Sequence, residues 1–210
     1  MMYLPLRPSS ASTDSGIPTP EPSLLRELPL IDSFGRVHNN LRVSVTDRCN
    51  IRCFYCMPAE NVQFMDRAEL LSFEEIERFV RVAVPLGLRK LRLTGGEPLV
   101  RRELWRLVEM LSGIEAIRDL SLTTNGYLLA RQVDELVRAG LKRINVSLDS
   151  LAPDRFFQLT RRDSLAQVLE GLEAAEAHPE LRPIKVNVVA LKDFTEDEVV
   201  RFAEFARKHP

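Results

Sequence analysis

The sequence has few cysteines, no long apolar run and no excess of charge of either sign. Only three of its 210 residues are cysteine, and an odd, clustered set does not suit a disulfide framework. No stretch approaches the roughly 18 to 20 apolar residues that a membrane span needs. Lys and Arg number 29 against 30 Asp and Glu, which excludes a global basic field for nucleic acid or membrane lipid. We therefore expect a cytoplasmic protein with no nucleic-acid or membrane partner.

The first 31 residues differ in composition from the rest. They combine the stretch "SSASTDSG" with six prolines, a mixture that cannot bury apolar surface and removes backbone donors. We expect a disordered Pro/Ser-rich tail at 1–31 and a folded core at 32–210. The alternative, a transit peptide, should contain more arginine and fewer acids than the segment around Glu21 and Glu27.

Short β-branched runs alternate with helical patterns from residue 41 onward. The runs occupy 41–47, 90–96, 119–126, 143–149 and 184–190. The helical patterns occupy 72–87, 101–113, 129–140, 164–178 and 195–209. Ser72 with Glu75 and Thr195 with Glu198 have capping-box spacing, while Gly87 and Gly140 stand where helices should end. Repeated βα units predict an α/β fold with a parallel sheet and right-handed crossovers.

Alternate positions of every predicted strand are polar, and the positions between them are almost all Val, Leu or Ile. A doubly wound sheet is buried on both faces, so this pattern disfavours it. The interior of an ordinary eight-stranded barrel is filled by bulky aliphatics, which also fits poorly. The pattern favours a wide, incomplete barrel with a polar interior, and the alternative is a polar face that meets water. Inside such a barrel Arg42, Arg92 and Lys185 would face an anionic ligand such as a phosphate chain.

The stretch "TDRCNIRCFYCMP" at 46–58 contains all three cysteines, Cys49, Cys53 and Cys56. It follows the first strand, at the end of a βα barrel where catalytic residues lie. Three thiolates suit zinc or an iron–sulfur cluster, and three ligands leave a fourth position open for reaction. A structural zinc needs a fourth ligand, and the only histidines, His38, His178 and His209, lack ligand spacing to the cysteines.

This motif, CxxxCxxC with Tyr55 before the third cysteine, resembles the cluster motif of the radical S-adenosylmethionine (SAM) enzymes. The stretch "TGGEP" at 94–98 is similar to that superfamily's motif for the SAM amino group. In it, Gly95 and Gly96 would let backbone carbonyls approach an ammonium closely, and Glu97 would add an acceptor. The resemblance implies a [4Fe–4S] cluster held by Cys49, Cys53 and Cys56. It also implies that SAM chelates the fourth iron through its amino and carboxylate groups.

Five stretches in order resemble the molybdenum cofactor biosynthesis protein A family, the GTP 3′,8-cyclases. They are "LRVSVTDRCNIRCFYCMP", "LRLTGGEPLVRREL", "LSLTTNGYLL", "AGLKRINVSLDSL" and "KVNVVALK". The resemblance implies a partial TIM-like (β/α)6 radical SAM barrel with five of six βα units present, and no side-chain catalyst. It implies SAM contacts from Tyr55, Gly96 and Ser147. It implies GTP contacts from Arg42, Arg92, Thr123 and Lys185.

The resemblance also implies a reaction of molybdenum cofactor (molybdopterin) biosynthesis. A 5′-deoxyadenosyl radical made from SAM would abstract hydrogen from C3′ of GTP, and attack on C8 would give (8S)-3′,8-cyclo-7,8-dihydroguanosine 5′-triphosphate. A reductant would supply the electron, and cyclic pyranopterin monophosphate synthase would act on the product. A homodimer is one expected assembly.

The family has a sixth βα unit and a C-terminal region in which three further cysteines hold a second [4Fe–4S] cluster. Those residues do not occur before Pro210, so we expect an N-terminal portion that binds SAM weakly and is inactive alone. Two alternatives stay open. One is a different radical SAM reaction, such as peptide maturation or haem-pathway chemistry, and the other is a non-catalytic iron–sulfur or zinc protein.

Overall fold

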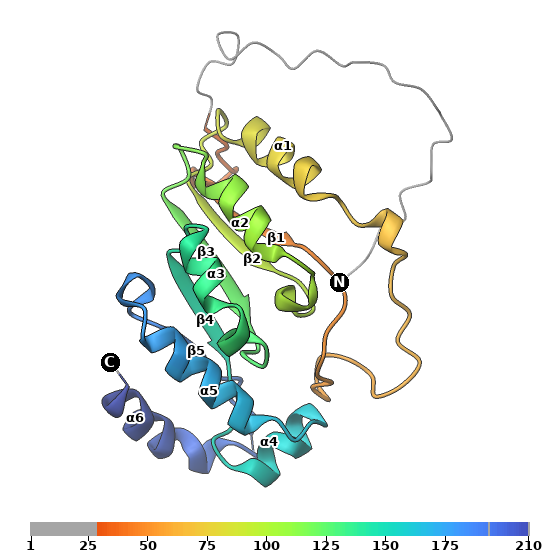
Figure 1. Ribbon diagram of the computed structural model, residues 1–210, viewed down its shortest axis with the longest axis vertical. Helices are drawn as coiled ribbons and strands as arrows, with labels where there is room; N and C mark the ends of the chain where they lie inside the picture. Colours follow the sequence, from red (N-terminus) through yellow and green to blue (C-terminus); the bar gives the residue numbers. More distant parts are fainter. Residues whose placement is uncertain (1–28, 193, 210) are drawn as a thin grey trace.

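Five parallel strands form one sheet in the computed structural model, which describes residues 29–192 and 194–209 (Figure 1). The strands lie side by side in chain order, and every neighbouring pair is parallel. They are β1 (Asn40–Ser44), β2 (Lys90–Thr94), β3 (Asp119–Thr124), β4 (Arg143–Ser147) and β5 (Lys185–Asn187). The five predicted strands are confirmed, and together with the intervening helices they make a partial TIM-like α/β fold.

Five of the six α-helices that the described residues form match the predicted helical patterns. They are α1 (Phe73–Ala83), α2 (Leu104–Ser112), α3 (Val133–Arg138), α5 (Leu165–Glu176) and α6 (Val199–Lys208). Helix α4 (Pro153–Thr160) was not predicted; it begins at a proline, whose fixed φ suits the first helical turn. Among the described residues, no helix is long and apolar enough to cross a membrane.

The ends of the helices test the predicted caps. Ser72 and Glu75 form the predicted capping box, in which Glu75 N donates to Ser72 Oγ (3.1 Å) and Ser72 N donates to Glu75 Oε2 (2.7 Å). Gly140 directly follows the C-cap of α3, with a φ of +101° that favours glycine. Helix α1 ends earlier than predicted, at Ala83, and Gly87, with a φ of +97°, closes the turn that follows it.

The capping box predicted for Thr195 and Glu198 is wrong. Glu198 is fully buried and accepts hydrogen bonds from Ser150 Oγ (2.6 Å) and Leu151 N (2.7 Å). The three-residue 3-10 turn η6 (Glu196–Glu198) has no side-chain cap. Burial of Glu198 against the loop after β4 therefore overrides the local spacing.

The predicted tail lies almost wholly outside the described residues, because only its last three residues, from Pro29 on, are described. Leu30 N donates to Leu86 O (3.0 Å), and Ile31 forms an antiparallel bridge with Val37. These contacts attach the segment before β1 to the segment after α1.

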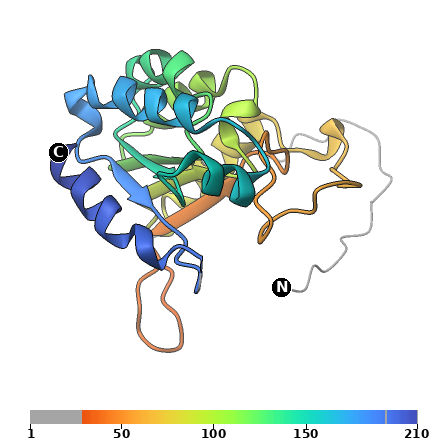
Figure 2. The ribbon, with the colours of Figure 1, turned by 90° about the horizontal axis from the view of Figure 1, so that it is seen from below.

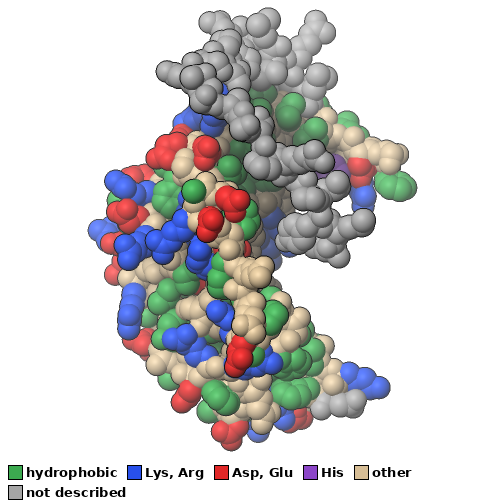
Figure 3. Space-filling model, turned by 90° about the vertical axis from the view of Figure 1, so that its right-hand side faces the viewer, with side chains coloured by type: hydrophobic (Ala, Val, Ile, Leu, Met, Phe, Trp, Pro, Cys, Tyr) green, Lys and Arg blue, Asp and Glu red, His purple; other side chains and the backbone are tan. Residues whose placement is uncertain are grey.

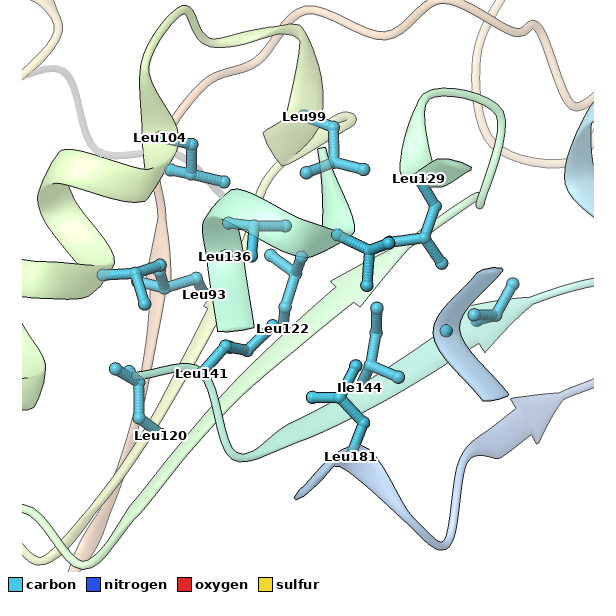
Figure 4. Close-up of a cluster of buried hydrophobic side chains, with 14 of the residues drawn as sticks. Leu93, Leu99, Leu104, Leu120, Leu122, Leu129, Leu136, Leu141, Ile144 and Leu181 are labelled. Carbon is cyan, nitrogen blue, oxygen red and sulfur yellow. The ribbon is translucent and has the colours of Figure 1, made fainter. Parts of the chain in front are cut away.

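The apolar positions of the strands face the helices and form the core. Leu93, Leu122 and Ile144 meet Leu104 and Leu136 from the helical layer in this core (Figure 4). Each of these side chains is at most 1% exposed. Truncation of such a leucine to alanine typically costs about 2 to 5 kcal/mol, so this layer fixes the strands that carry the site.

Helices α2, α3 and α5 cover the apolar face of the sheet (Figure 2), and the opposite face is polar. The register aligns Arg42 with Arg92 and Arg92 with Ser121, and it aligns Thr123 with Asn145 and Asn145 with Lys185. The molecule is hollowed on this side (Figure 3). Because the described sheet ends at β1 and β5, its polar face forms the floor of an open hollow.

A glycine turn after β2 brings that strand against the segment that leads from β1 to the cysteines. Gly96 N donates to Thr46 O (2.7 Å), and Glu97 N donates to Arg48 O (2.8 Å). A Cβ atom on Gly96 would lie 2.5 Å from Arg48 O and 2.6 Å from Asp47 O. Only glycine therefore permits this approach.

The side chain of Glu97 ties the end of β2 to the end of β3. It is 1% exposed, and its two oxygens accept from Thr124 Oγ1 (2.7 Å), Asn125 N (2.7 Å) and Leu99 N (3.0 Å). Burial raises the pKa of Glu97 from 4.5 to about 7, even though these three hydrogen bonds favour the ionised form.

We predict that Gly96→Ala lowers the free energy of unfolding by roughly 2 kcal/mol or more, because backbone oxygens cannot move aside cheaply. Gly113→Ala is the matched control. Its φ is −70° and the nearest atom to an added Cβ is 3.5 Å away, so it should be neutral or slightly stabilising. Urea unfolding measures both, and equal effects would refute the close-approach account.

We also predict that the stability of the chain relative to its Glu97→Gln variant falls as pH rises. The folded pKa, about 7, exceeds the unfolded value of 4.5, so the contribution is complete below pH 4.5 and is lost as pH rises through 7. Relative to the variant, the free energy of unfolding should fall by about 3 kcal/mol between the two ends of this pH range. Urea unfolding from pH 4 to 9 with a chelator present checks it, and parallel pH profiles would contradict it.

Candidate functional site

A cavity of about 260 Å³ lies at the carboxyl ends of β1 to β4, where parallel α/β folds place their chemistry. It is lined from the cysteine loop, the glycine turn after β2, and the ends of β3 and β4. Seven of the ten predicted site residues line this one cavity: Cys49, Cys53, Cys56, Tyr55, Gly96, Ser147 and Thr123.

The three cysteines are free thiols that border the same cavity. Burial raises the pKa of Cys49, and it raises the pKa of Cys53 to about 11. Among the described residues, no three His, Cys, Asp or Glu side chains converge closely enough to hold a single metal ion. Three soft sulfur donors that border one cavity suit an iron–sulfur cluster. The donor set therefore fits the cluster that the motif implies.

Tyr55 connects the cysteine loop to the segment that follows β4. Its hydroxyl donates to Asp149, and the other oxygen of Asp149 accepts from Val189 N (2.8 Å). Asp149 is 5% exposed, and burial followed by the neighbouring Asp149 raises the pKa of Tyr55. The hydroxyl of Tyr55 is thus engaged by the protein, while its ring borders the cavity.

Glu97 was expected to offer an acceptor to the SAM amino group. Both of its side-chain oxygens already accept hydrogen bonds from Leu99, Thr124 and Asn125, so its role is to position the strand ends. Gly95 and Gly96 likewise pack against the backbone of 46–48, while Gly96 still borders the cavity.

Asn125 is a site residue that the sequence reasoning missed. It is 8% exposed, its Nδ2 donates to Asn50 Oδ1 (2.8 Å) and approaches Cys49 Sγ (3.9 Å), and its Oδ1 accepts from Tyr127 N (3.0 Å). An Asn-Gly pair directly after a strand is a turn signal that could have indicated it.

The predicted cations do not line the cavity but lie on the adjoining polar floor. Arg92 Nε donates to Ser121 Oγ (3.4 Å). In the part of the chain that the structure describes, no acidic side chain pairs with Arg42, Arg92 or Lys185. The Thr123 hydroxyl, which borders the cavity, is buried with no hydrogen-bond partner. A ligand that reaches Thr123 from the floor would meet unpaired cations and an unpaired hydroxyl.

Comparison with curated proteins gives relatives that are longer than this chain. A GTP 3′,8-cyclase of Pelotomaculum thermopropionicum is 50% identical over 179 residues, which is 85% of this chain and 55% of the relative. Molybdenum cofactor biosynthesis protein 1 of Drosophila melanogaster is 47% identical over 192 residues, which is 91% of this chain and 34% of the relative. The chain therefore spans about half or less of these proteins.

Comparison with solved structures and family models agrees on the fold. Streptococcus suis SuiB bound to S-adenosylmethionine has a TM-score of 0.68 at 18% identity, covering 81% of this chain and 38% of that one. The model of the radical SAM superfamily matches residues 43–206, which include the three cysteines and all five strand ends. This chain belongs to the radical SAM superfamily.

Proposed function

We propose that this chain is the SAM-binding portion of a GTP 3′,8-cyclase that serves molybdenum cofactor biosynthesis. The observation that carries the proposal is the adjacency of two features on one sheet. Three thiols border a cavity at the carboxyl ends of the strands, and three cations, which have no acidic partner among residues 29–192 and 194–209, lie on the polar floor beside it. The names of the relatives support the same activity.

Superfamily membership brings an iron–sulfur cluster and SAM as cofactors. Cys49, Cys53 and Cys56 would hold the cluster, and when bound it supplies the electron that cleaves SAM. The chain's own contribution is to fix the loop that carries these thiols. Gly96 and Glu97 hold its start against β2, Asn125 holds Asn50, and Asp149 holds Tyr55.

Tyr55, Gly96 and Ser147 would contact SAM, because they border the cavity from the cysteine loop, the turn after β2 and the end of β4. Ser147 is exposed at the end of β4, where its hydroxyl is available to a ligand. Phe156 and Ile51, at most 9% exposed, line the same cavity and limit access of water to it.

Arg42, Arg92, Thr123 and Lys185 would contact GTP. Arg42 and Arg92 form one aligned row across β1 and β2, and Lys185 shares a row with Asn145 and Thr123. The rows lie two residues apart along the strands, roughly 7 Å, which is within the reach of a triphosphate chain. Guanidinium and ammonium groups together suit phosphate oxygens.

The remaining features of the family are part of the proposal. A reductant feeds the cluster, cyclic pyranopterin monophosphate synthase uses the product, and the protein works in the cytoplasm, with a homodimer as one assembly. The second [4Fe–4S] cluster that the family resemblance implies is part of the proposal as well. A different radical SAM reaction would use the same cysteines but would not need the three cations.

We predict that the anaerobically reconstituted chain binds about four irons, with spectra that change on addition of SAM. Alanine at Cys49, Cys53 or Cys56 should lower iron retention several-fold, because a cluster with two thiolate ligands is lost readily. Iron and sulfide analysis with absorption spectroscopy measures this. One zinc per chain, or full iron retention in the variants, would contradict the assignment.

We predict that Arg92→Ala weakens GTP binding at least tenfold, which is the loss expected for one charge-assisted phosphate contact. Arg78→Ala, on the exposed surface of α1, is the control and should bind GTP as the parent does. Isothermal titration with GTP measures both. Retained iron and SAM binding with no GTP binding in the parent chain would favour a different radical SAM reaction.

A further inference from the structure

The side chain of Asn125, directly after β3, has an amide whose orientation is fixed by contacts at both ends. Its Oδ1 accepts from Tyr127 N (3.0 Å), and its Nδ2 donates to Asn50 Oδ1 (2.8 Å). A reversed amide would set its NH₂ group against the N–H of Tyr127, donor against donor. The nitrogen therefore lies on the side of Cys49 and Asn50.

The backbone around Asn125 is held as firmly as its side chain. Asn125 N donates to Glu97 Oε2 (2.7 Å), and Gly126 N donates to Thr124 Oγ1 (3.1 Å). Glu97 and Thr124 are both buried at the strand ends. The amide therefore cannot move away from the cysteine loop unless these buried hydrogen bonds break.

One of the two N–H groups of this amide is left for a cysteine sulfur. A primary amide has two donors, and Asn50 Oδ1 uses only one of them. Asn125 Nδ2 also lies 3.9 Å from Cys49 Sγ, a long N–H···S contact. In the part of the chain that the structure describes, no other side-chain amide hydrogen-bonds to Cys49, Cys53 or Cys56. The donor thus distinguishes one cysteine from the other two.

Asn50 adds a second buried amide donor next to Cys49. Its Oδ1 accepts from Asn125 Nδ2, and its backbone O accepts from Arg162 Nη1 (2.5 Å). Its own Nδ2 is buried and has no hydrogen-bond partner among the described residues. A buried donor left unpaired costs about 1 to 3 kcal/mol, and an anionic sulfur nearby offsets that cost. The surroundings of Cys49 therefore favour negative charge on its sulfur.

We propose that the Asn125 amide raises the reduction potential of the cluster by donating an N–H···S hydrogen bond to the Cys49 thiolate. The inference rests on the proposed function, because it requires the cluster. On reduction the cluster gains one electron, and no covalent bond or proton moves. The added negative charge is shared by the sulfur ligands, so a donor at one of them stabilises the reduced form more than the oxidised form. Asn125 acts through Cys49 and is a positioning residue.

Two substitutions separate the amide donor from the turn that Asn125 closes. Asn125→Ser keeps a side-chain oxygen for Tyr127 N, because serine forms the same kind of turn, but it lacks the amide donor. Asn125→Asp keeps the shape and the acceptor, and replaces the donor by a second acceptor. Asn40→Asp is the matched control for the added charge. Asn40 is exposed at the amino end of β1, opposite to the end that leads to the cysteine loop.

The test is a potentiometric titration of the reconstituted chain without SAM, followed by electron paramagnetic resonance. Asn125→Ser should lower the equilibrium constant for one-electron reduction about tenfold, which corresponds to about 59 mV, and Asn125→Asp should lower it further. Asn40→Asp should leave the constant within about twofold of the parent value. Equal potentials in the parent and the two Asn125 variants would overturn the proposal.

A second readout comes from the parent chain itself, labelled with ¹⁵N in the side-chain amides of asparagine. Pulsed electron paramagnetic resonance of the reduced cluster should show a ¹⁵N coupling that Asn125→Ser lowers. A parent chain without this coupling, or a variant that keeps all of it, would also overturn the proposal. Failure of the parent chain to take up iron would instead refute the proposed function, so the two failures are distinguishable.

Discussion

The contact between the glycine turn after β2 and the backbone at 46–48 is the constraint on which the site depends. Backbone atoms of the two segments meet without an intervening side chain, because Gly96 donates to Thr46 O and a Cβ there would strike Arg48 and Asp47. The same turn directs Glu97 into the gap between β2 and β3. Three strand ends are thereby locked around the loop that carries the cysteines.

The sheet separates packing from chemistry. Its apolar face is covered by the helices, and its polar face and carboxyl edge carry the residues proposed for GTP, SAM and the cluster. This separation explains why polar residues alternate along strands that are otherwise aliphatic.

Much of the fold could be predicted from the sequence because its signals are local and repeated. The five parallel strands, the five main helices and the cap at Ser72 follow from periodicity and spacing. The remaining features depend on tertiary contacts, which the local sequence does not indicate. Glu198 has capping spacing, yet it is buried against Ser150, and α4 arises from eight residues that carry only a proline as a signal.

The candidate site was predicted in its chemistry but not in its internal contacts. Spacing identified the cysteines, and alternation identified Arg42, Arg92 and Lys185. No pattern could show that Glu97 accepts hydrogen bonds from Thr124 and Asn125, or that Asp149 accepts one from Tyr55. These pairs are distant in sequence.

The most direct test of the account is electron paramagnetic resonance of the reconstituted, dithionite-reduced chain, recorded with and without SAM. The account predicts the signal of a reduced [4Fe–4S] cluster that shifts when SAM is added, because three thiolates leave one iron open to the cofactor. A signal that SAM does not alter, or a chain that retains zinc and no iron, would contradict it.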